Sequence, residues 1–423
     1  MRFETLQDWL SWQESLHPSL IDLGLERVSQ VFTRLHADFK PPFTVITVAG
    51  TNGKGSSIAL LEAILLAAGY RVGTYTSPHL LRYNERIRIN GEQASDAAIC
   101  QAFQRIDTAR GETSLTYFEF GTLAALDIFY RSPPDIVLLE VGLGGRLDAV
   151  NIVDADIALI TAIGLDHTDW LGTDREAIAT EKAGVMRVAH PVVCSDEDTP
   201  RAIQAHAEAL QAPLYCLGRD FGHEPANGQW QWWSRALQRH GLPKPALPGV
   251  HQLNNASGVL MVLELLADRF PTTAAHVREG LRAMRLRGRY EQRTDGVLQI
   301  LDVAHNVDSA VALANVLRAS GRTGESHAVV GMLADKDTRG VLQALLPLVD
   351  VWHCADLTLP RGATAAQLAA ELRALDGNAT IHTHASVFAA WQAALRACGK
   401  NTGHRIIAFG SFYTVAELLA RGV

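Results

Sequence analysis

A Gly-rich turn between an apolar run and a helical pattern lies near the start of the chain, in TVITVAGTNGKGSSIALLEAILLAAG. The run has the composition of a buried strand, and Ile58, Leu61, Leu65 and Ala68 recur at helical spacing after the turn. Backbone N–H groups at such a helix N-terminus bind phosphate oxygens, and Lys54 is placed to reach the β/γ-phosphates of a nucleotide. The segment therefore indicates an α/β domain that binds a nucleotide.

This loop departs from the usual GxxxxGK[ST] pattern. The first glycine is missing from its usual place, and Gly55 separates Lys54 from Ser56, whose hydroxyl would face the metal. Taken alone, the segment is also compatible with a Gly-rich turn that only caps a helix.

Short β-rich runs followed by helical patterns form two series along the chain, as expected for parallel sheets with crossover helices. The first series is FTVITVAG, RVGTYTSPH, DIVLLEVGLGG and DIALITAIGLDH, and the second is VLQILDVAHN, HAVVGMLADKD, DVWHCADL and RIIAFGSF. We predict an α/β fold with a P-loop-type parallel-sheet ATPase domain over residues 1–286 and a smaller Rossmann-like domain over 297–423. The basic stretch 287–296 is predicted to be a linker, and 219–248 an irregular or hairpin-like insertion without an assigned role.

Composition excludes several classes of protein. The 423 residues include 38 Lys+Arg and 45 Asp+Glu, and the net charge of -7 disfavours a surface built to bind nucleic acid. The segment MRFETLQDWLSWQESLH does not resemble a signal peptide, and no apolar run has membrane-spanning length, so we expect a cytoplasmic protein. The scattered cysteines favour reduced core thiols over zinc ligands or disulfides; they are Cys100, Cys194, Cys216, Cys354 and Cys398.

The loop AGTNGKGS resembles the nucleotide loop of the Mur-ligase superfamily. Further blocks resemble the folylpolyglutamate synthase and dihydrofolate synthase family, in that family's order: YTSPHLLRYNERIRING, SLTYFEFGTLAAL, LLEVGLGGRLDAVNIV, IGLDHTDWLG, EKAG, LDVAHN, GMLADKD and GSFYTV. The resemblance extends from IDLGLERV to GSFYTV and is weakest over 219–248. It implies an ATP- and Mg²⁺-dependent ligase that joins L-glutamate to 7,8-dihydropteroate and extends tetrahydrofolate with further glutamates, through an acyl phosphate.

The resemblance also assigns residues to ATP and to catalysis. Lys54, Lys182 and Arg289 are expected to be catalytic, and Arg289 can bind phosphate through two parallel hydrogen bonds. Arg287 replaces a proline that is usual in this block, which affects the predicted linker. The expected ATP contacts are Gly50, Thr51, Asn52, Gly53, Lys54, Gly55, Ser56, Asn255, Arg289 and Asp302.

Three polar side chains lie at predicted strand ends, where open α/β sheets bind ligands. By resemblance, Ser77, Glu140 and His167 are the ligands of Mg²⁺, and Lys182 is carbamylated beside a second Mg²⁺. From the residues alone, His167 could instead be a hydrogen-bonded loop histidine, Glu140 could form a salt bridge with an arginine, and Lys182 could be a solvated helical lysine.

The resemblance implies a pterin pocket that combines apolar walls with a few hydrogen-bonding groups. The expected residues are Asp22, Leu23, Gly24, Leu25, Thr116, Tyr117, Phe118, Glu119, Leu147, Asp148 and Ala149. Ordinary core packing with a structural Asp–Arg contact is the alternative. Four residues of the second domain are weaker candidates for binding glutamate, and each could instead be a helix cap or part of a surface pair: His305, Asp335, Lys336 and Ser411.

Three other functions remain open from the sequence. A monofunctional folylpolyglutamate synthase would not turn over dihydropteroate, and the IDLGLERV and TYFE motifs disfavour it. A peptidoglycan-precursor ligase is disfavoured because the nucleotide loop begins so near residue 1. A nucleotide-binding regulator without catalysis is disfavoured by Lys54, Glu140, His167 and Lys182. By analogy with the family we expect a monomer.

Overall fold

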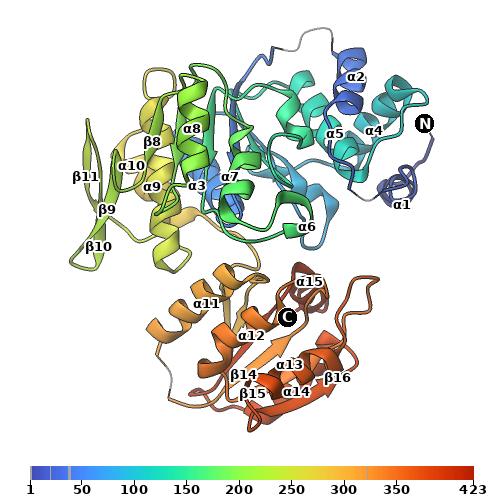
Figure 1. Ribbon diagram of the computed structural model, residues 1–423, viewed down its shortest axis with the longest axis vertical. Coiled ribbons are helices and arrows are strands. Elements are labelled where there is room, and N and C mark those ends of the chain that lie inside the picture. The colour runs from blue at the N-terminus through green and yellow to red at the C-terminus, as the bar shows by residue number, and fades with distance from the viewer. Residues whose placement is uncertain (1, 20, 37–39, 322) are drawn as a thin grey trace. The chain divides into compact units, whose positions relative to one another are not determined.

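The computed structural model describes residues 2–19, 21–36, 40–321 and 323–423. The chain forms two compact α/β units, coloured blue to yellow and orange to red in Figure 1. Unit 1 comprises Met1–Ala246 and Gln252–Met284, and unit 2 comprises Leu247–His251 and Arg285–Val423. The predicted fold class, a parallel-sheet domain followed by a smaller α/β domain, is confirmed.

The described residues of unit 1 form an eight-stranded sheet in the order β4-β3-β2-β5-β1-β6-β7-β8. The strands from β2 to β8 in this order are parallel, and β3 and β4 extend the edge in antiparallel fashion. Strand β1 lies between β5 and β6. The strands that follow β1 in the sequence are added first on its β5 side and later on its β6 side. Open α/β sheets bind ligands at the strand where this order reverses. The bounds are β1 Thr44–Ala49, β2 Val72–Tyr75, β3 Ile87–Ile89, β4 Glu92–Gln93, β5 Ile136–Glu140, β6 Ile157–Ile160, β7 Val192–Cys194 and β8 Leu214–Cys216.

Helix α3, which follows the Gly-rich turn, is buried between the sheet and α10. Gly280 lets the two helices approach, because a Cβ there would lie 2.4 Å from Cγ1 of Ile64. The helices of unit 1 are α1 Leu6–Gln13, α2 Glu26–Leu35, α3 Lys54–Ala67, α4 Asp96–Arg110, α5 Tyr117–Arg131, α6 Thr168–Leu171, α7 Arg175–Ala183, α8 Arg201–Ala209, α9 Val250–Leu265 and α10 Ala274–Ala283, with 3₁₀ turns η1 Tyr83–Arg86 and η2 Ala149–Ile152.

The segment predicted as a hairpin-like insertion forms a small antiparallel sheet in the order β11-β10-β9. Its strands are β9 Phe221–Ala226, β10 Gln229–Ser234 and β11 Gln238–Leu242. Trp230 and Trp232 alternate onto the buried face of β10. The indole of Trp232 donates a hydrogen bond to the Ser257 carbonyl of α9 (3.1 Å), which attaches the small sheet to the body of unit 1.

Unit 2 has a six-stranded sheet over its described residues, in the order β12-β13-β17-β14-β15-β16. All neighbours are parallel except the pair β12–β13. Its elements are β12 Glu291–Asp295, β13 Val297–Leu301, α11 Val307–Ala319, β14 Ser326–Val330, α12 Thr338–Leu345, η3 Leu346–Leu348, β15 Val351–Ala355, α13 Ala365–Leu375, β16 Thr380–His384, α14 Val387–Cys398, β17 Arg405–Phe409 and α15 Phe412–Ala420.

The stretch 287–296 is not simply a linker, because it contains strand β12 at the edge of the second sheet. Its side chains are exposed or half-buried, so the segment lacks the apolar alternation that signals a strand. Gly296, with φ of +71°, makes the tight turn into β13. The last passage of the chain from unit 1 to unit 2 falls between Met284 and Arg285.

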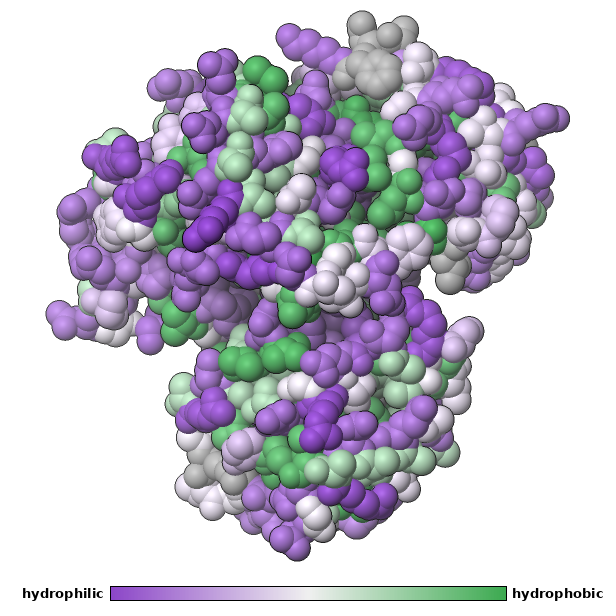
Figure 2. Space-filling view, in the orientation of Figure 1, coloured by the Kyte–Doolittle hydropathy of each residue, from purple (hydrophilic) through white to green (hydrophobic). Residues whose placement is uncertain are grey.

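The surface is predominantly hydrophilic on the face shown in Figure 2, where hydrophobic residues occur in small groups. Among the described residues, no helix combines the length and apolar character needed to cross a bilayer. All five cysteines are buried and none forms a disulfide.

Candidate active site

The Gly-rich loop is fixed against the segment that follows β6. Backbone N–H of Thr51 donates to the carbonyl of Ala162 (2.8 Å), and the Thr51 hydroxyl donates to the carbonyl of Gly164 (3.0 Å). Gly50 has φ of +146°, and a Cβ at this position would lie 1.9 Å from Oγ1 of Thr161. Only glycine fits there, so the tight path of the loop is set by its composition.

Helix α3 begins directly at Lys54, which places the loop N–H groups and the positive end of the helix dipole together. The Lys54 Nζ donates to the carbonyls of Gly50 (2.9 Å) and Thr51 (3.2 Å), so its charge lies over the loop. Gly53 has φ of +98°, and a Cβ there would lie 2.4 Å from Oδ1 of Asn255. The predicted loop and Asn255 are therefore brought together in unit 1.

Gln252 joins this group, although the residue-by-residue analysis of the sequence missed it. Its Nε2 donates to Oγ of Ser56 (3.4 Å), and its Oε1 accepts from Nδ2 of Asn255 (3.3 Å). Residues three apart share one face of a helix, and Gln252 and Asn255 both lie on α9. The spacing within HQLNNA was the signal that could have identified it.

The candidate metal ligands end or follow β2, β5 and β6 at the carboxyl-terminal edge of the sheet. Glu140 ends β5, is only 6% exposed, and lies in register with Val48 just before the loop. The backbone N–H of Ser77 donates to Oε2 of Glu140 (3.1 Å), so these two residues are adjacent. His167 follows β6 on the opposite side of β1, with φ of +53°. Its ring Nε2 lies 4.0 Å from Oδ2 of Asp166.

Lys182 is not a solvated lysine, because it is 4% exposed on α7. The helix begins after Asp174, whose side chain accepts from the N–H of Ala177, and ends before Gly184, as predicted. Burial, reinforced by the charge of Lys54, lowers the pKa of Lys182 to about 7. A buried amine with this pKa is neutral in a large share of molecules at neutral pH.

Asp148 holds the loop after β5. Its Oδ2 accepts from the N–H of Leu143 (2.8 Å) and its Oδ1 from the N–H of Val150 (3.0 Å). The residue is 2% exposed, and burial raises its pKa to about 6 against the opposing effect of these hydrogen bonds and of Lys54. Asp148 itself therefore contacts backbone amides, and the Asp–Arg contact named as the structural alternative for this group is found at Asp22 instead.

The turn before α2 and the start of α5, both predicted to face a pterin, are joined by Arg27. Its guanidinium pairs with Oδ2 of Asp22 (2.7 Å) and with Oε1 of Glu119 (3.1 Å). Thr116 and Glu119 form a capping box at the start of α5, with Thr116 N–H donating to Oε2 of Glu119 (2.7 Å). Arg27 lies within the IDLGLERV block, but sequence analysis did not single it out.

Aromatic side chains line the same region. The ring of Phe118 lies so close to Gly142 that a Cβ there would be 2.6 Å from Cζ of the ring. Arg86 lies over the rings of Tyr83 (5.5 Å) and Tyr117 (5.7 Å), which fixes these side chains by cation–π contacts. The remaining predicted pterin residues lie in the same two segments or beside Asp148: Leu23, Gly24, Leu25, Leu147 and Ala149.

Within unit 2, Arg289 and Asp302 lie near one another. The Asp302 carboxylate accepts from the N–H groups of Tyr290 and Ala304, each at 2.8 Å. Burial raises the pKa of Asp302, and the charge of Arg289 opposes this shift. The guanidinium of Arg289 lies 5.3 Å from the ring centre of Phe412.

The four weaker candidates for binding glutamate follow strands of the second sheet. Ser411 caps α15 by accepting from the N–H of Thr414 (3.0 Å), and Asp335 pairs with Arg361. Both contacts fit the structural alternatives of a helix cap and a surface pair. Nδ1 of His305 contacts the carbonyl oxygen of Val303 (2.8 Å), and Lys336 lies in the turn before α12.

Two family models match this chain. The Mur ligase middle domain matches residues 48–263, and the Mur ligase glutamate ligase domain matches residues 286–412. A Gly-rich loop at the end of a central strand of the first sheet, with a second α/β unit later in the chain, is thus the arrangement of a Mur ligase.

Comparison with individual proteins identifies the family within the Mur ligases. The dihydrofolate synthase/folylpolyglutamate synthase of Escherichia coli (strain K12) is 44% identical, over 98% of this chain and 94% of its own length. A structure of E. coli FolC in complex with DHPP and ADP has a TM-score of 0.93 and 43% identity, covering 99% of both chains. A bifunctional folylpolyglutamate synthase/dihydrofolate synthase with Mn, AMPPNP and L-glutamate bound has a TM-score of 0.90 and 47% identity, covering 99% of this chain and 98% of that one. The chain belongs to the dihydrofolate synthase/folylpolyglutamate synthase family.

Proposed function

We propose that this protein is an ATP-dependent ligase that joins L-glutamate to 7,8-dihydropteroate and then adds glutamates to tetrahydrofolate. The observation that carries the proposal is the proximity, in one sheet, of the Lys54 loop after β1 and the buried Glu140 at the end of β5. Relatives crystallised with ADP and DHPP, and with AMPPNP and L-glutamate, support the same substrates here.

The reaction follows from the chemistry of carboxylates. A carboxylate is a poor acyl donor, so its oxygen first attacks the γ-phosphorus of ATP and forms an acyl phosphate while ADP leaves. The amine of glutamate then attacks the acyl carbon, the phosphate leaves, and an amide remains. Lys54 and the loop N–H groups stabilise the charge on the transferring phosphoryl group. Positioning and electrostatics therefore account for most of the catalysis.

The residues at the sheet edge fit a hard divalent cation. Glu140 supplies a buried carboxylate, an oxygen donor of the kind that Mg²⁺ prefers. Ser77 lies beside it, and His167 follows the strand on the other side of β1. When bound, Mg²⁺ would neutralise phosphate charge. We propose Ser77, Glu140 and His167 as its ligands, with Arg289, Asn255 and Asp302 as further contacts to ATP.

We further propose that Lys182 is carbamylated and faces a second Mg²⁺. The neutral amine is the form that adds CO₂, and the product carries a negative charge that two nearby cations would favour. The burial of Lys182 and the proximity of Lys54 support this assignment.

Lys182→Ala is expected to lower ligation by about 100-fold, by analogy with the loss of groups that orient a metal site. Added acetate or formate should restore part of the rate, because a small carboxylate can replace the carbamate. Lys244→Ala, at an exposed lysine, is the matched control and should change nothing. Native mass spectrometry of the wild type should show the mass of one CO₂. No such mass, together with no rescue, would contradict the carbamate.

Asp148→Asn is expected to impair the dihydropteroate reaction more than the addition of glutamate to tetrahydrofolate. Loss of one backbone acceptor should also lower stability by about 1–3 kcal/mol. Comparing kcat/KM for both substrates, with thermal unfolding measured in parallel, checks both effects. Equal losses with the two substrates would mean that Asp148 only holds the loop.

The remaining assignments are proposals of the same kind. We propose that the pterin lies against the segments joined by Arg27 and the aromatic residues near Phe118, and that glutamate is bound by residues of unit 2. The proposed residues are His305, Asp335, Lys336 and Ser411, which follow strands of the second sheet. We also propose a cytoplasmic monomer, to be checked by light scattering of the purified chain.

Release of phosphate from ATP, measured with glutamate and each pteroyl substrate separately, tests the proposed function. Release with both dihydropteroate and tetrahydrofolate is expected. Release with tetrahydrofolate alone would identify a monofunctional folylpolyglutamate synthase. Release with neither would refute the folate assignment.

A further inference from the structure

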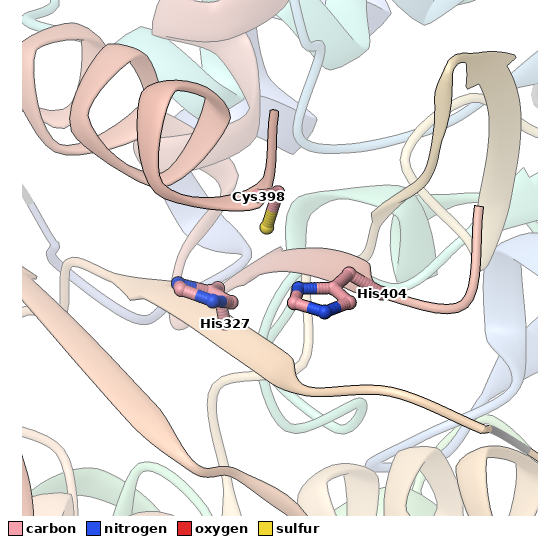
Figure 3. A group of neighbouring side chains, drawn as sticks. All are labelled: His327, Cys398 and His404. Atoms are coloured by element: carbon pink, nitrogen blue, oxygen red, sulfur yellow. The ribbon is translucent and has the colours of Figure 1, made fainter. Parts of the chain in front are cut away.

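A group of histidines and one cysteine gathers in unit 2, away from the residues assigned to ATP or glutamate. Ligand atoms of His327, Cys398 and His404 all lie within 4.8 Å of one another. Figure 3 shows the Cys398 sulfur directed toward the space between the two imidazole rings. His327 is 2% exposed and Cys398 4% exposed, so the group lies largely inside the fold.

A carboxylate completes the set of donors. Oε2 of Glu325 lies 3.4 Å from Nε2 of His327 and 3.9 Å from Nδ1 of His404. That Nδ1 is buried and has no hydrogen-bond partner among the described residues. Two imidazoles, one thiol and one carboxylate therefore converge, a combination typical of four-coordinate zinc and of other borderline-soft divalent ions.

A row of histidines extends from His327 across the sheet. Nδ1 of His327 lies 3.2 Å from Nε2 of His353, and Nδ1 of His353 lies 3.2 Å from Nε2 of His384. When Nδ1 of His327 and Nδ1 of His353 carry the protons of this row, Nε2 of His327 has a free lone pair on the side of Glu325. Histidines that bind metals usually donate their other N–H in this way, which orients the ring.

The cluster lies at the amino-terminal edge of the second sheet. His327 is near the start of β14, His404 precedes β17, and Cys398 ends α14. Strands β14 and β17 are parallel, so Ser411, which follows the end of β17, lies at the opposite edge. The cluster is therefore separate, within unit 2, from the strand ends proposed to bind glutamate.

We propose that His327, Cys398, His404 and Glu325 form a structural site for Zn²⁺ or a similar divalent transition metal. The ion ties three segments together: the start of β14, the end of α14 and the turn before β17. It binds the folded state in preference to the unfolded chain and so raises thermal stability.

Titration of the metal-free full chain with Co²⁺ tests this site, because a thiolate bound to Co²⁺ gives a sulfur-to-metal charge-transfer absorption. In the wild type the band should increase until one Co²⁺ is bound per chain, and in Cys398→Ser no band should form. Cys100→Ser is the matched control, since Cys100 is also 4% exposed, and it should retain the band. The oxygen and imidazole ligands proposed near the ATP loop include no thiol and so cannot produce this signal.

A second variant keeps the test valid if Cys398→Ser fails to fold. His404→Gln removes a ligand whose side chain is 16% exposed and should weaken Zn²⁺ binding by at least about tenfold, whereas His382→Gln, at an exposed neighbour outside the donor set, should not. Zn²⁺ should raise the Tm of the wild type and of His382→Gln only. A wild type without the Co²⁺ band, a band that persists in Cys398→Ser, or equal Zn²⁺ affinity of His404→Gln and wild type would overturn the site.

Discussion

Lys54→Ala is expected to reduce both ligations by roughly 10³-fold, the scale of effect seen when one donor to a developing negative charge is removed. The side chain lies over the loop through its contacts with the carbonyls of Gly50 and Thr51, so its loss removes the positive charge nearest to the proposed phosphoryl transfer. Steady-state rates with dihydropteroate and with tetrahydrofolate measure this effect.

The fold should survive this change, because the two hydrogen bonds that are lost each contribute only about 1 kcal/mol. A thermal unfolding curve close to that of the wild type checks this point, and Lys244→Ala controls for the loss of a lysine in general. Near-normal turnover by folded Lys54→Ala would show that the loop does not bind the triphosphate.

Glu140→Gln is expected to lower both activities by roughly 100-fold or more and to raise the Mg²⁺ concentration needed for half-maximal rate. The substitution keeps the shape of the side chain and an oxygen that can accept from the N–H of Ser77, but it removes the negative charge that would bind the cation. The rate should therefore be measured over a range of Mg²⁺ concentrations at saturating ATP.

The free energy of unfolding of Glu140→Gln shows whether Glu140 acts in metal binding or only supports the fold. Glutamine at this position keeps an acceptor for the N–H of Ser77, so the free energy of unfolding should change little. Glu279→Gln, at an exposed glutamate on α10, is the matched control. A loss of activity with unchanged dependence on Mg²⁺ would argue that Glu140 only supports the strand end.

Much of the first sheet is predictable from the sequence because local signals agree there. The run TVITVA is apolar throughout since β1 is buried on both faces, and Gly50 and Gly53 mark positions where the backbone needs positive φ. Strand β12 gave no such signal, because an exposed edge strand needs no apolar face. The expectation of a linker there was a consequence of composition alone.

The candidate site is predictable only in part, for a related reason. Residues at strand ends can be assigned by topology to one edge of the sheet, and Ser77 and Glu140 are in contact there. The backbone N–H groups that donate to Asp148 and the pairing of Arg27 depend on the paths of separate loops, which no local pattern encodes. The same holds for Cys398, whose sequence neighbourhood indicates a core thiol, whereas folding brings it to His327 and His404.

Transfer of an oxygen isotope tests the central claim most directly. Dihydropteroate labelled with oxygen-18 in its carboxylate is incubated with ATP, glutamate and the protein, and the released phosphate is examined by mass spectrometry. An acyl phosphate formed at the Lys54 loop predicts that each phosphate carries one labelled oxygen. Turnover that releases only unlabelled phosphate would contradict activation of the carboxylate by ATP and the account built on it.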